Sequence, residues 1–148
     1  MIFIGVDPGQ SGAVVALDEC GHVVRVVKND GTERDTFEAF CGYENSDVFA
    51  IIERVHSMPK QGVASSFKFG QSYGFLRGCL VGSCAVFSEV TPQQWQKTMG
   101  CLTHGDKNVS KQRAQQLFPR EKITHKTADA FLIAEYCRRD FTKQEPTP

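Results

Sequence analysis

The apolar run IFIGV at residues 2–6 ends in a carboxylate, Asp7, after which the chain passes through PGQSG into a second apolar run, AVVAL. This pattern predicts a buried strand, a tight turn and a second strand that runs back antiparallel to the first. Asp7 then lies at the end of a buried strand, where an unpaired carboxylate is strongly disfavoured. We therefore expect the folded chain to neutralise Asp7, to pair it or to place a cation beside it.

Two further acidic residues have similar settings. Glu53 ends the apolar run VFAII, and Asp129 lies near the start of an apolar helical pattern in TADAFLIA. One such acid alone is most often an ordinary strand-end or first-turn residue. Three of them on separate apolar elements favour a metal site assembled by folding, because carboxylate oxygens are the ligands that hard cations such as Mg²⁺ prefer.

The order of the apolar patterns predicts an α/β fold. The first three strands are joined by short, turn-rich links and form an antiparallel meander, whereas a helix before the fourth strand makes that strand parallel to the first. We expect a five-stranded mixed sheet with helices on both faces, in one domain over residues 1–148 that frays from about residue 141. The expected strands cover 2–7, 12–18, 22–29, 47–55 and 83–90, and the expected helices cover 32–43, 63–82, 91–95, 107–118 and 127–139.

Two expected helices begin with capping signals, and a third carries a glycine stripe. Thr32 or Asp35 can cap helix 32–43, and the segment TPQQ at 91–94 has the pattern of a capping box. Glycines 70, 74 and 78 recur every four residues along helix 63–82, although each lowers helix propensity by about 1 kcal/mol. Close approach of another backbone, from a strand or from a partner subunit, is the explanation we favour.

The net charge is zero, but its distribution is uneven. Residues 1–53 carry ten acidic and three basic side chains, whereas residues 54–148 carry seven acidic and fourteen basic ones. Such asymmetry is typical of a protein with a polyanion-binding face, although folding can also mix the two halves and leave no patch. With 41% hydrophobic and 23% charged residues, the composition is that of a globular protein, and no apolar stretch is long enough to span a membrane.

The six cysteines form no CxxC pair, and several lie in apolar segments. We interpret them as reduced core thiols and expect neither a disulfide framework nor a zinc site. The first residues run directly into the Asp7 turn without the basic and apolar regions of a signal peptide. These features predict an intracellular, cytoplasmic protein.

Five segments together resemble the RuvC-type Holliday-junction resolvases: IGVDPGQSGA, the block from ERVHSMPKQG to FGQSYG, VTPQQWQKTMG, KNVSKQRAQQLFP and HKTADAFLIAEYCRR. The match covers nearly the whole chain in the correct order. The DPG turn alone also occurs in actin-like sugar kinases, whereas the second and last segments are much more specific. The likeness is greatest to the versions common in phage genomes, and a phage-encoded member acts in the cytoplasm of its host.

The resemblance implies an RNase H-like fold, a homodimer, and paired nicks placed symmetrically across a four-way DNA junction that leave 5′-phosphate and 3′-hydroxyl ends. By motif, Asp7, Glu53 and Asp129 fill three of the four usual acidic positions. The fourth normally lies three or four residues before Asp129, where this chain has Lys126 and His125. Because a neutral imidazole can ligate a metal and an ammonium cannot, we assign the fourth role to His125. The implied cofactor is a pair of Mg²⁺ ions, replaceable by Mn²⁺, with no small-molecule cofactor.

Contacts to DNA phosphates are expected from the basic half of the chain. The candidates are Lys60, Lys97, Lys107, Lys111 and Arg113. Lys97 and Lys107 fall where the family uses lysines near the active site, while others in this set can equally be solvated surface charges. Bacterial relatives place an aromatic residue just past the Glu53 position at the junction centre. In this chain that role falls to His56, or to Phe67 or Phe69, which are otherwise core residues, and Trp95 is expected to be buried.

Three other functions fit part of the sequence. A nuclease of the same fold can cut flaps and forks as well as four-way junctions, and the missing fourth acid raises the alternative of a catalytically impaired junction-binding protein. An actin-like phosphotransferase needs two such domains and a second Asp-Gly phosphate loop, and the 148 residues contain neither.

Overall fold

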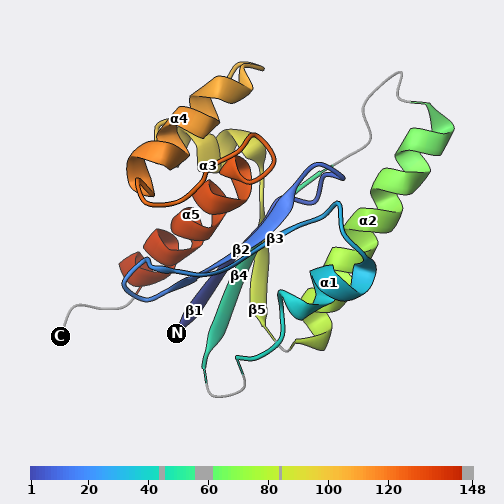
Figure 1. Cartoon of the computed structure of the whole chain (residues 1–148), viewed down its shortest axis with the longest axis horizontal. Coiled ribbons are helices and arrows are strands. Elements are labelled where there is room, and N and C mark those ends of the chain that lie inside the picture. The colour runs from blue at the N-terminus through green and yellow to red at the C-terminus, as the bar shows by residue number, and fades with distance from the viewer. Residues whose placement is uncertain (44–45, 56–61, 84, 145–148) are drawn as a thin grey trace.

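The chain folds into a five-stranded mixed sheet with helices on both faces (Figure 1). The computed structural model describes residues 1–43, 46–55, 62–83 and 85–144. The strand order is β3-β2-β1-β4-β5, in which β1 pairs antiparallel with β2 and parallel with β4. The strands are β1 (Ile2–Val6), β2 (Ala13–Asp18), β3 (Val23–Lys28), β4 (Val48–Glu53) and β5 (Val86–Val90). The predicted meander and the predicted parallel strands are both confirmed.

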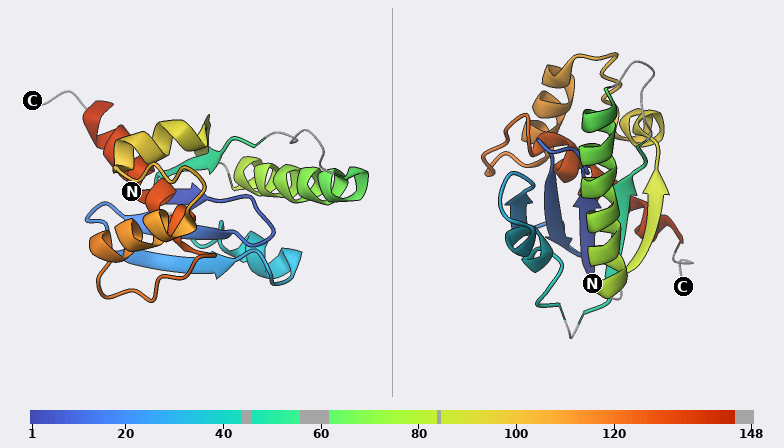
Figure 2. Two further views of the ribbon diagram at one scale, coloured as in Figure 1. Left: turned by 90° about the horizontal axis from the view of Figure 1, so that it is seen from above. Right: turned by 90° about the vertical axis from the view of Figure 1, so that its right-hand side faces the viewer.

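The helices form two groups, one on each face of the sheet (Figures 1 and 2). Helices α3, α4 and α5 lie on one face, and α1 and α2 lie on the other. The helices are α1 (Glu33–Glu38), α2 (Val63–Gly82), α3 (Pro92–Met99), α4 (Lys107–Leu117) and α5 (Ala128–Gln144). Figure 2 shows the first turns of α2 extending beyond the ends of the strands.

Buried side chains of the central strands alternate between the two faces, as the two-residue period of a strand requires. Phe3 of β1 packs in the core beneath α5, whereas Ile2, Ile4 and Val6 pack in the core beneath α1 and α2. Because β1 and β4 are covered on both sides, their sequences are continuous apolar runs. Strand β3 lies at the edge of the sheet, and its residues alternate between half-buried and exposed.

Helix α5 approaches β1 closely at Gly5, which is fully enclosed. A Cβ atom at Gly5 would meet the backbone of α5, including the Cα of Ala134 at 2.7 Å. Only glycine therefore lets the helix and the strand lie this close. The close packing fixes the first turn of α5, which carries Asp129, relative to the end of β1, which leads into Asp7.

The two predicted helix caps are present, with differences in detail. Thr32 and Asp35 cap α1 reciprocally, but α1 ends at Glu38 and not at residue 43. Arg25 of β3 donates to the carbonyl oxygens of Glu38 and Cys41 at this end of the helix. The Thr91 hydroxyl accepts from the Gln94 N–H at 3.3 Å. The Gln94 side chain does not complete a capping box, because it donates to Tyr136 Oη at 3.3 Å.

The chain remains helical past residue 141, where fraying was expected to begin. Helix α5 continues to Gln144, and the Phe141 ring packs on Phe49 and Phe3 with ring centroids 3.9 and 5.6 Å apart. This aromatic cluster holds the last turns of α5 against the sheet. Residues 145–148 lie outside the described part of the chain.

The glycine stripe of α2 does not contact the sheet. A Cβ atom added at Gly70, Gly74 or Gly78 would meet no atom within 4 Å among the described residues. The expectation that a strand of the same chain explains these glycines is therefore wrong. A partner subunit remains the other explanation.

Three of the cysteines, Cys79, Cys101 and Cys137, are buried thiols, as expected, whereas Cys20 is exposed and Cys41 is half-buried. Cys84 lies outside the described residues. Across the ranges that the structure describes, no helix combines the length and the apolar character needed to cross a membrane.

Candidate active site

The register of the parallel pair brings two of the predicted acids together. Val6 of β1 is opposite Ile52 of β4, so that Asp7 and Glu53 are the next residues at the carboxyl ends of two neighbouring strands. The first turn of α5 adds Asp129, whose charge acts on both. The structure thus gathers three of the predicted site residues at one end of the sheet.

Burial raises the pKa values of all three carboxyl groups, and repulsion from neighbouring carboxylates adds to the rise for Asp7 and Glu53. Burial, with the Asp129 charge next, raises the pKa of Asp7 to about 6, although the Gly9 N–H and the Lys107 ammonium oppose this. Burial raises the pKa of Glu53 to about 7, against a hydrogen bond from Trp95 and with help from Asp7 and Asp129. The pKa of Asp129 is also raised by burial, which a hydrogen bond from Ser110 and the Lys107 charge partly offset.

The donor set fits a divalent cation. Three oxygen ligands converge in a partly buried place where their charges repel one another, and a bound cation would remove both penalties. The three acids do not bring one oxygen each within 4.8 Å of the other two. Among the described residues, only a group at the β2–β3 turn has its ligand atoms this close together.

Trp95 orients Glu53. Its indole Nε1 donates to Glu53 Oε2 at 2.6 Å, and its side chain is completely buried at the start of α3. The sequence indicated a buried Trp95, which is correct, but not its contact with Glu53. The available signal was the indole N–H itself, because a buried indole usually finds an acceptor.

The loop that carries Asp7 is held by residues of two other parts of the chain and is closely packed within itself. Asn29, just after β3, donates through Nδ2 to the carbonyl oxygens of Asp7 at 2.7 Å and Gly9 at 3.0 Å. Ser72 of α2 donates to the Pro8 carbonyl at 3.2 Å. Gly12 lies against Asp7, because a Cβ atom at this position would be 2.8 Å from Asp7 Cγ. The contacts of Asn29 and Ser72 were not predicted, because they join residues far apart in the sequence.

Helix α4 contributes two residues to the site. Asp106 caps this helix by accepting from the Asn108 N–H at 2.9 Å, which fixes Lys107 as its first residue. The Lys107 charge acts on Asp7 and Asp129, and Ser110, one turn later and buried, donates to the Asp129 carboxylate. Lys107 was among the predicted residues, whereas Ser110 was missed because serine in a helix has no specific sequence signal.

His125, the predicted fourth group, is exposed in the turn before α5. It is not among the groups that shift the pKa values of Asp7, Glu53 or Asp129. The adjacent Lys126 extends to the end of β3, where its ammonium lies 2.8 Å from Asp30 Oδ2.

The predicted DNA-binding residues have different environments. Lys97 is exposed on α3 and Lys111 is half-buried on α4. Arg113 is already engaged, because its Nε donates to the Met99 carbonyl at 2.8 Å and so joins α4 to α3.

The residues proposed for the junction centre also differ in environment. Phe67 is 70% exposed, which contradicts a core role. Phe69 is half-buried and lines a cavity of about 580 Å³ between α1 and α2. His56 and Lys60 lie outside the described residues.

Comparison with known structures gives a clear result for the fold. A Thermus thermophilus RuvC in complex with Holliday junction substrate superposes with a TM-score of 0.61 over 97% of this chain and 95% of that chain, at 12% sequence identity. A second Thermus thermophilus RuvC structure gives a TM-score of 0.59 over 97% and 96% of the two chains, at 16% identity. This chain has the RuvC fold. No protein-family model matches its sequence, and no curated protein matches it either.

Proposed function

We propose that this protein is a metal-dependent DNA endonuclease that resolves four-way junctions. The observation that carries the proposal is the convergence of Asp7, Glu53 and Asp129, with raised pKa values, at the carboxyl ends of β1 and β4 in a RuvC fold. Three partly buried carboxylates beside a single lysine are unfavourable without a bound cation. Such a group suits metal-assisted phosphodiester hydrolysis. The substrate class follows from the structural relative, which was captured with a Holliday junction.

Asp7, Glu53 and Asp129 would hold two Mg²⁺ ions, for which Mn²⁺ can substitute. Bound ions of this kind neutralise charge on a scissile phosphate and lower the pKa of a water molecule. The protein holds each carboxylate by a separate donor: the Gly9 N–H for Asp7, the Trp95 indole for Glu53 and the Ser110 hydroxyl for Asp129. These donors keep the three groups in place before substrate arrives, which limits the reorganisation needed for catalysis.

Lys107 and the exposed basic residues would bind the DNA backbone. Lys107 is at the start of α4, where its charge already acts on Asp7 and Asp129, so a phosphate at the carboxylates would lie within its reach. Lys97 and Lys111 would neutralise phosphates farther along the DNA. Cleavage would leave 5′-phosphate and 3′-hydroxyl ends.

His125 would assist at the attacking water as the fourth group of the site. The missing acid at this position motivates the assignment, and variants at the same position test it. His125→Ala should reduce cleavage by on the order of 10²-fold, the usual scale for a positioned acid–base group, whereas His125→Asp should retain activity. Full activity of His125→Ala would leave three carboxylates as the complete site. His104→Ala, at an exposed histidine in the α3–α4 loop, is the matched control.

The functional unit would be a homodimer, because paired nicks need two active sites. The outer face of α2 supports this proposal. Val63, Phe67 and Val81 are 89%, 70% and 66% exposed, and they recur with the three glycines of the stripe at three- and four-residue spacing. These six positions, which we call the α2 stripe, form one apolar side of the helix without bulky polar groups.

The decisive experiment is incubation of the purified protein with a synthetic four-way junction and Mg²⁺ or Mn²⁺, followed by mapping of the products on all four strands. Symmetric paired nicks that disappear with a chelator and in Asp7→Asn are expected. Equal cleavage of Y-forks and flaps would instead indicate a general branched-DNA nuclease. Tight junction binding without cleavage in either metal would indicate a catalytically impaired binding protein.

A further inference from the structure

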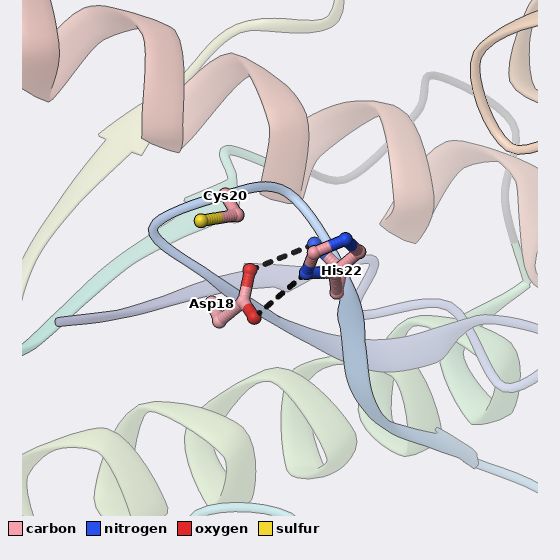
Figure 3. A group of neighbouring side chains, drawn as sticks. All are labelled: Asp18, Cys20 and His22. Carbon is pink, nitrogen blue, oxygen red and sulfur yellow. Dashed lines mark hydrogen bonds and ion pairs between the residues drawn. The ribbon is translucent and has the colours of Figure 1, made fainter.

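A second group of metal-ligating side chains lies at the turn between β2 and β3 (Figure 3). Asp18 is paired with Ile2 at the start of β1, so this turn is at the opposite end of the sheet from Asp7. One ligand atom each from Asp18, Cys20 and His22 lies within 4.8 Å of the other two. Within the described ranges, no other set of three histidine, cysteine or acidic side chains meets this criterion.

The backbone of the turn already holds the three residues on one side. The Asp18 N–H donates to the His22 carbonyl at 2.9 Å, and the Gly21 N–H donates to the Asp18 carbonyl at 3.0 Å. Gly21 has a φ of 84°, a conformation that side chains other than glycine rarely adopt. These contacts define the path of the turn in the protein without a metal ion.

The side chains of Asp18 and His22 point toward one another, as Figure 3 shows. The His22 Nδ1 lies 3.1 Å from one Asp18 oxygen, and the His22 backbone N–H donates to the other oxygen at 2.8 Å. Cys20 lies between them in the sequence and is exposed, and its sulfur lies within 4.8 Å of a ligand atom of each. Exposure of Cys20 and His22 also gives an ion direct access from solvent.

The ligand set selects the metal. Thiolate, imidazole and carboxylate together match Zn²⁺, which binds nitrogen and sulfur ligands in tetrahedral sites, whereas Mg²⁺ requires oxygen ligands. Three protein ligands leave a fourth position for water. The missing CxxC pattern excluded a zinc site from the sequence, but that pattern describes sites with two cysteines and not this mixed set.

The surrounding charges are compatible with a bound cation. Arg138 of α5 interacts with Asp18 and Cys20, but its guanidinium is held by Glu135 through two hydrogen bonds of 2.8 and 2.9 Å. On the other side, Glu19 lies 3.8 Å from the Met1 amino group. A divalent ion bound by one carboxylate and one thiolate forms a neutral unit, so Arg138 would not face a net positive charge.

We propose that Asp18, Cys20 and His22 form a Zn²⁺ site that is separate from the carboxylate site. Binding forms one bond each from Zn²⁺ to the sulfur, an imidazole nitrogen and a carboxylate oxygen, and the proton of the Cys20 thiol passes to solvent. Zn²⁺ replaces the hydrogen bond between His22 and Asp18 and clamps the β2–β3 turn. Because the turn is distant from Asp7, the bound ion takes no part in phosphodiester cleavage.

Co²⁺ is the probe, because a cobalt ion bound to thiolate shows a sulfur-to-metal charge-transfer band in the near ultraviolet that carboxylate ligands do not give. Titration of the full-length, reduced protein with Co²⁺ should produce this band with one equivalent bound, and added Zn²⁺ should abolish it. Cys20→Ser should lose the band, whereas Cys41→Ser, at a half-buried cysteine outside the turn, should keep it. A band that survives in Cys20→Ser, or no band in the wild-type protein at millimolar Co²⁺, overturns the proposal.

A second measurement separates this site from the carboxylate site. Zn²⁺ at 100 times its dissociation constant stabilises a folded protein by about 2.7 kcal/mol, so the thermal midpoint of the wild-type protein should rise. The rise should persist in Asp7→Asn and vanish in His22→Ala. If Asp7→Asn removes the effect and His22→Ala does not, the Zn²⁺ ion binds at the carboxylates and the proposal is wrong.

Discussion

Helices α5 and α2 cover opposite faces of the same sheet, but they use glycine in opposite ways. On the α5 face the glycine belongs to the strand, because Gly5 lets the helix backbone approach β1 directly. On the α2 face the glycines belong to the helix and point away from the sheet, with nothing within 4 Å of their Cβ positions among the described residues. In the first arrangement, α5 packs directly on β1, which places Asp129 of α5 near Asp7. The second leaves a smooth apolar surface suited to a second copy of the chain.

The same residue type thus has two different settings in one chain, one enclosed by a neighbouring backbone and the other exposed on the face that we propose for dimer contact. Glycine at an enclosed strand position is required by the neighbouring backbone, whereas glycine on an exposed helix face lowers helix stability and has no compensating contact inside the chain. Variants on the two faces should therefore have different defects. Those at the α5 face should lose stability or cleavage activity, and those at the α2 face should lose dimerisation.

The largest effect on cleavage is expected for Asp129, the acid in the first turn of α5. Asp129→Asn keeps the side-chain volume and removes one negative ligand, so cleavage of a four-way junction in Mg²⁺ should fall by on the order of 10²–10⁴-fold. Junction affinity, measured by gel shift in a non-catalytic divalent ion, should be unchanged or slightly higher. Asp47→Asn, at an exposed acid just before β4 at the far end of the sheet, is the control and should cleave normally. Retention of more than a tenth of the activity in Asp129→Asn would remove Asp129 from the site.

The next effect concerns association through the α2 stripe. Gly74→Leu places a bulky side chain in the middle of the stripe. No described atom of the same chain lies within 4 Å of the Cβ position, so the substitution should not destabilise the fold of the single chain. Light scattering should show a dimer for the wild-type protein and a monomer for Gly74→Leu, with unchanged far-ultraviolet circular dichroism. Paired nicks on the junction should become independent single nicks.

Gln71→Leu provides the matched control, because Gln71 is exposed on α2 but lies beside the cavity toward α1 and not on the stripe. This variant should remain dimeric. A wild-type protein that is monomeric at micromolar concentration, with and without junction DNA, would contradict a symmetric mechanism.

The third effect tests the close contact between α5 and β1. Gly5→Ala adds a single methyl group, but that group meets the backbone of Ala134 and cannot be accommodated by rotation of a side chain. Overpacking of this kind costs about 1–3 kcal/mol, and the urea midpoint should fall accordingly. Gly31→Ala is the control, because a Cβ atom there meets only the side chain of exposed Asp35, at 3.2 Å. Equal midpoints for the two variants would show that α5 can move away from β1 without cost.

Much of this architecture could be predicted from the sequence, because it depends on local patterns. Continuous apolar runs mark β1 and β4, and the acids at their ends follow from strand boundaries alone. The contacts of Trp95, Ser110 and Asn29 could not be predicted, because each joins elements that only the tertiary fold brings together. The end of α5 was placed too early for the same reason, since the packing partners of Phe141 lie in β1 and β4.

The smallest effect is the pH dependence of stability in the metal-free protein. The pKa values of Asp7 and Glu53, about 6 and about 7 in the folded protein, are above the ordinary values that these groups have when unfolded. At these two groups the folded state therefore binds more protons than the unfolded state between about pH 4 and pH 7, so their contribution to stability is largest at the low end of this range and falls as pH rises through the folded pKa values. Unfolding in urea with a chelator should show a loss on the order of 1–3 kcal/mol between pH 5.5 and 7.5.

The two faces should again differ in this measurement. Asp129→Asn removes a charge that raises both pKa values, so its stability should fall less steeply with pH than that of the wild-type protein. Gly74→Leu changes no group near the carboxylates and should keep the full slope. Saturating Mg²⁺ should flatten the slope of the wild-type protein, because a bound cation favours the ionised carboxylates that repulsion otherwise disfavours. A metal-free protein whose stability rises over this pH range would mean that the carboxylates are paired by other groups, and the case for a cation at this end of the sheet would be lost.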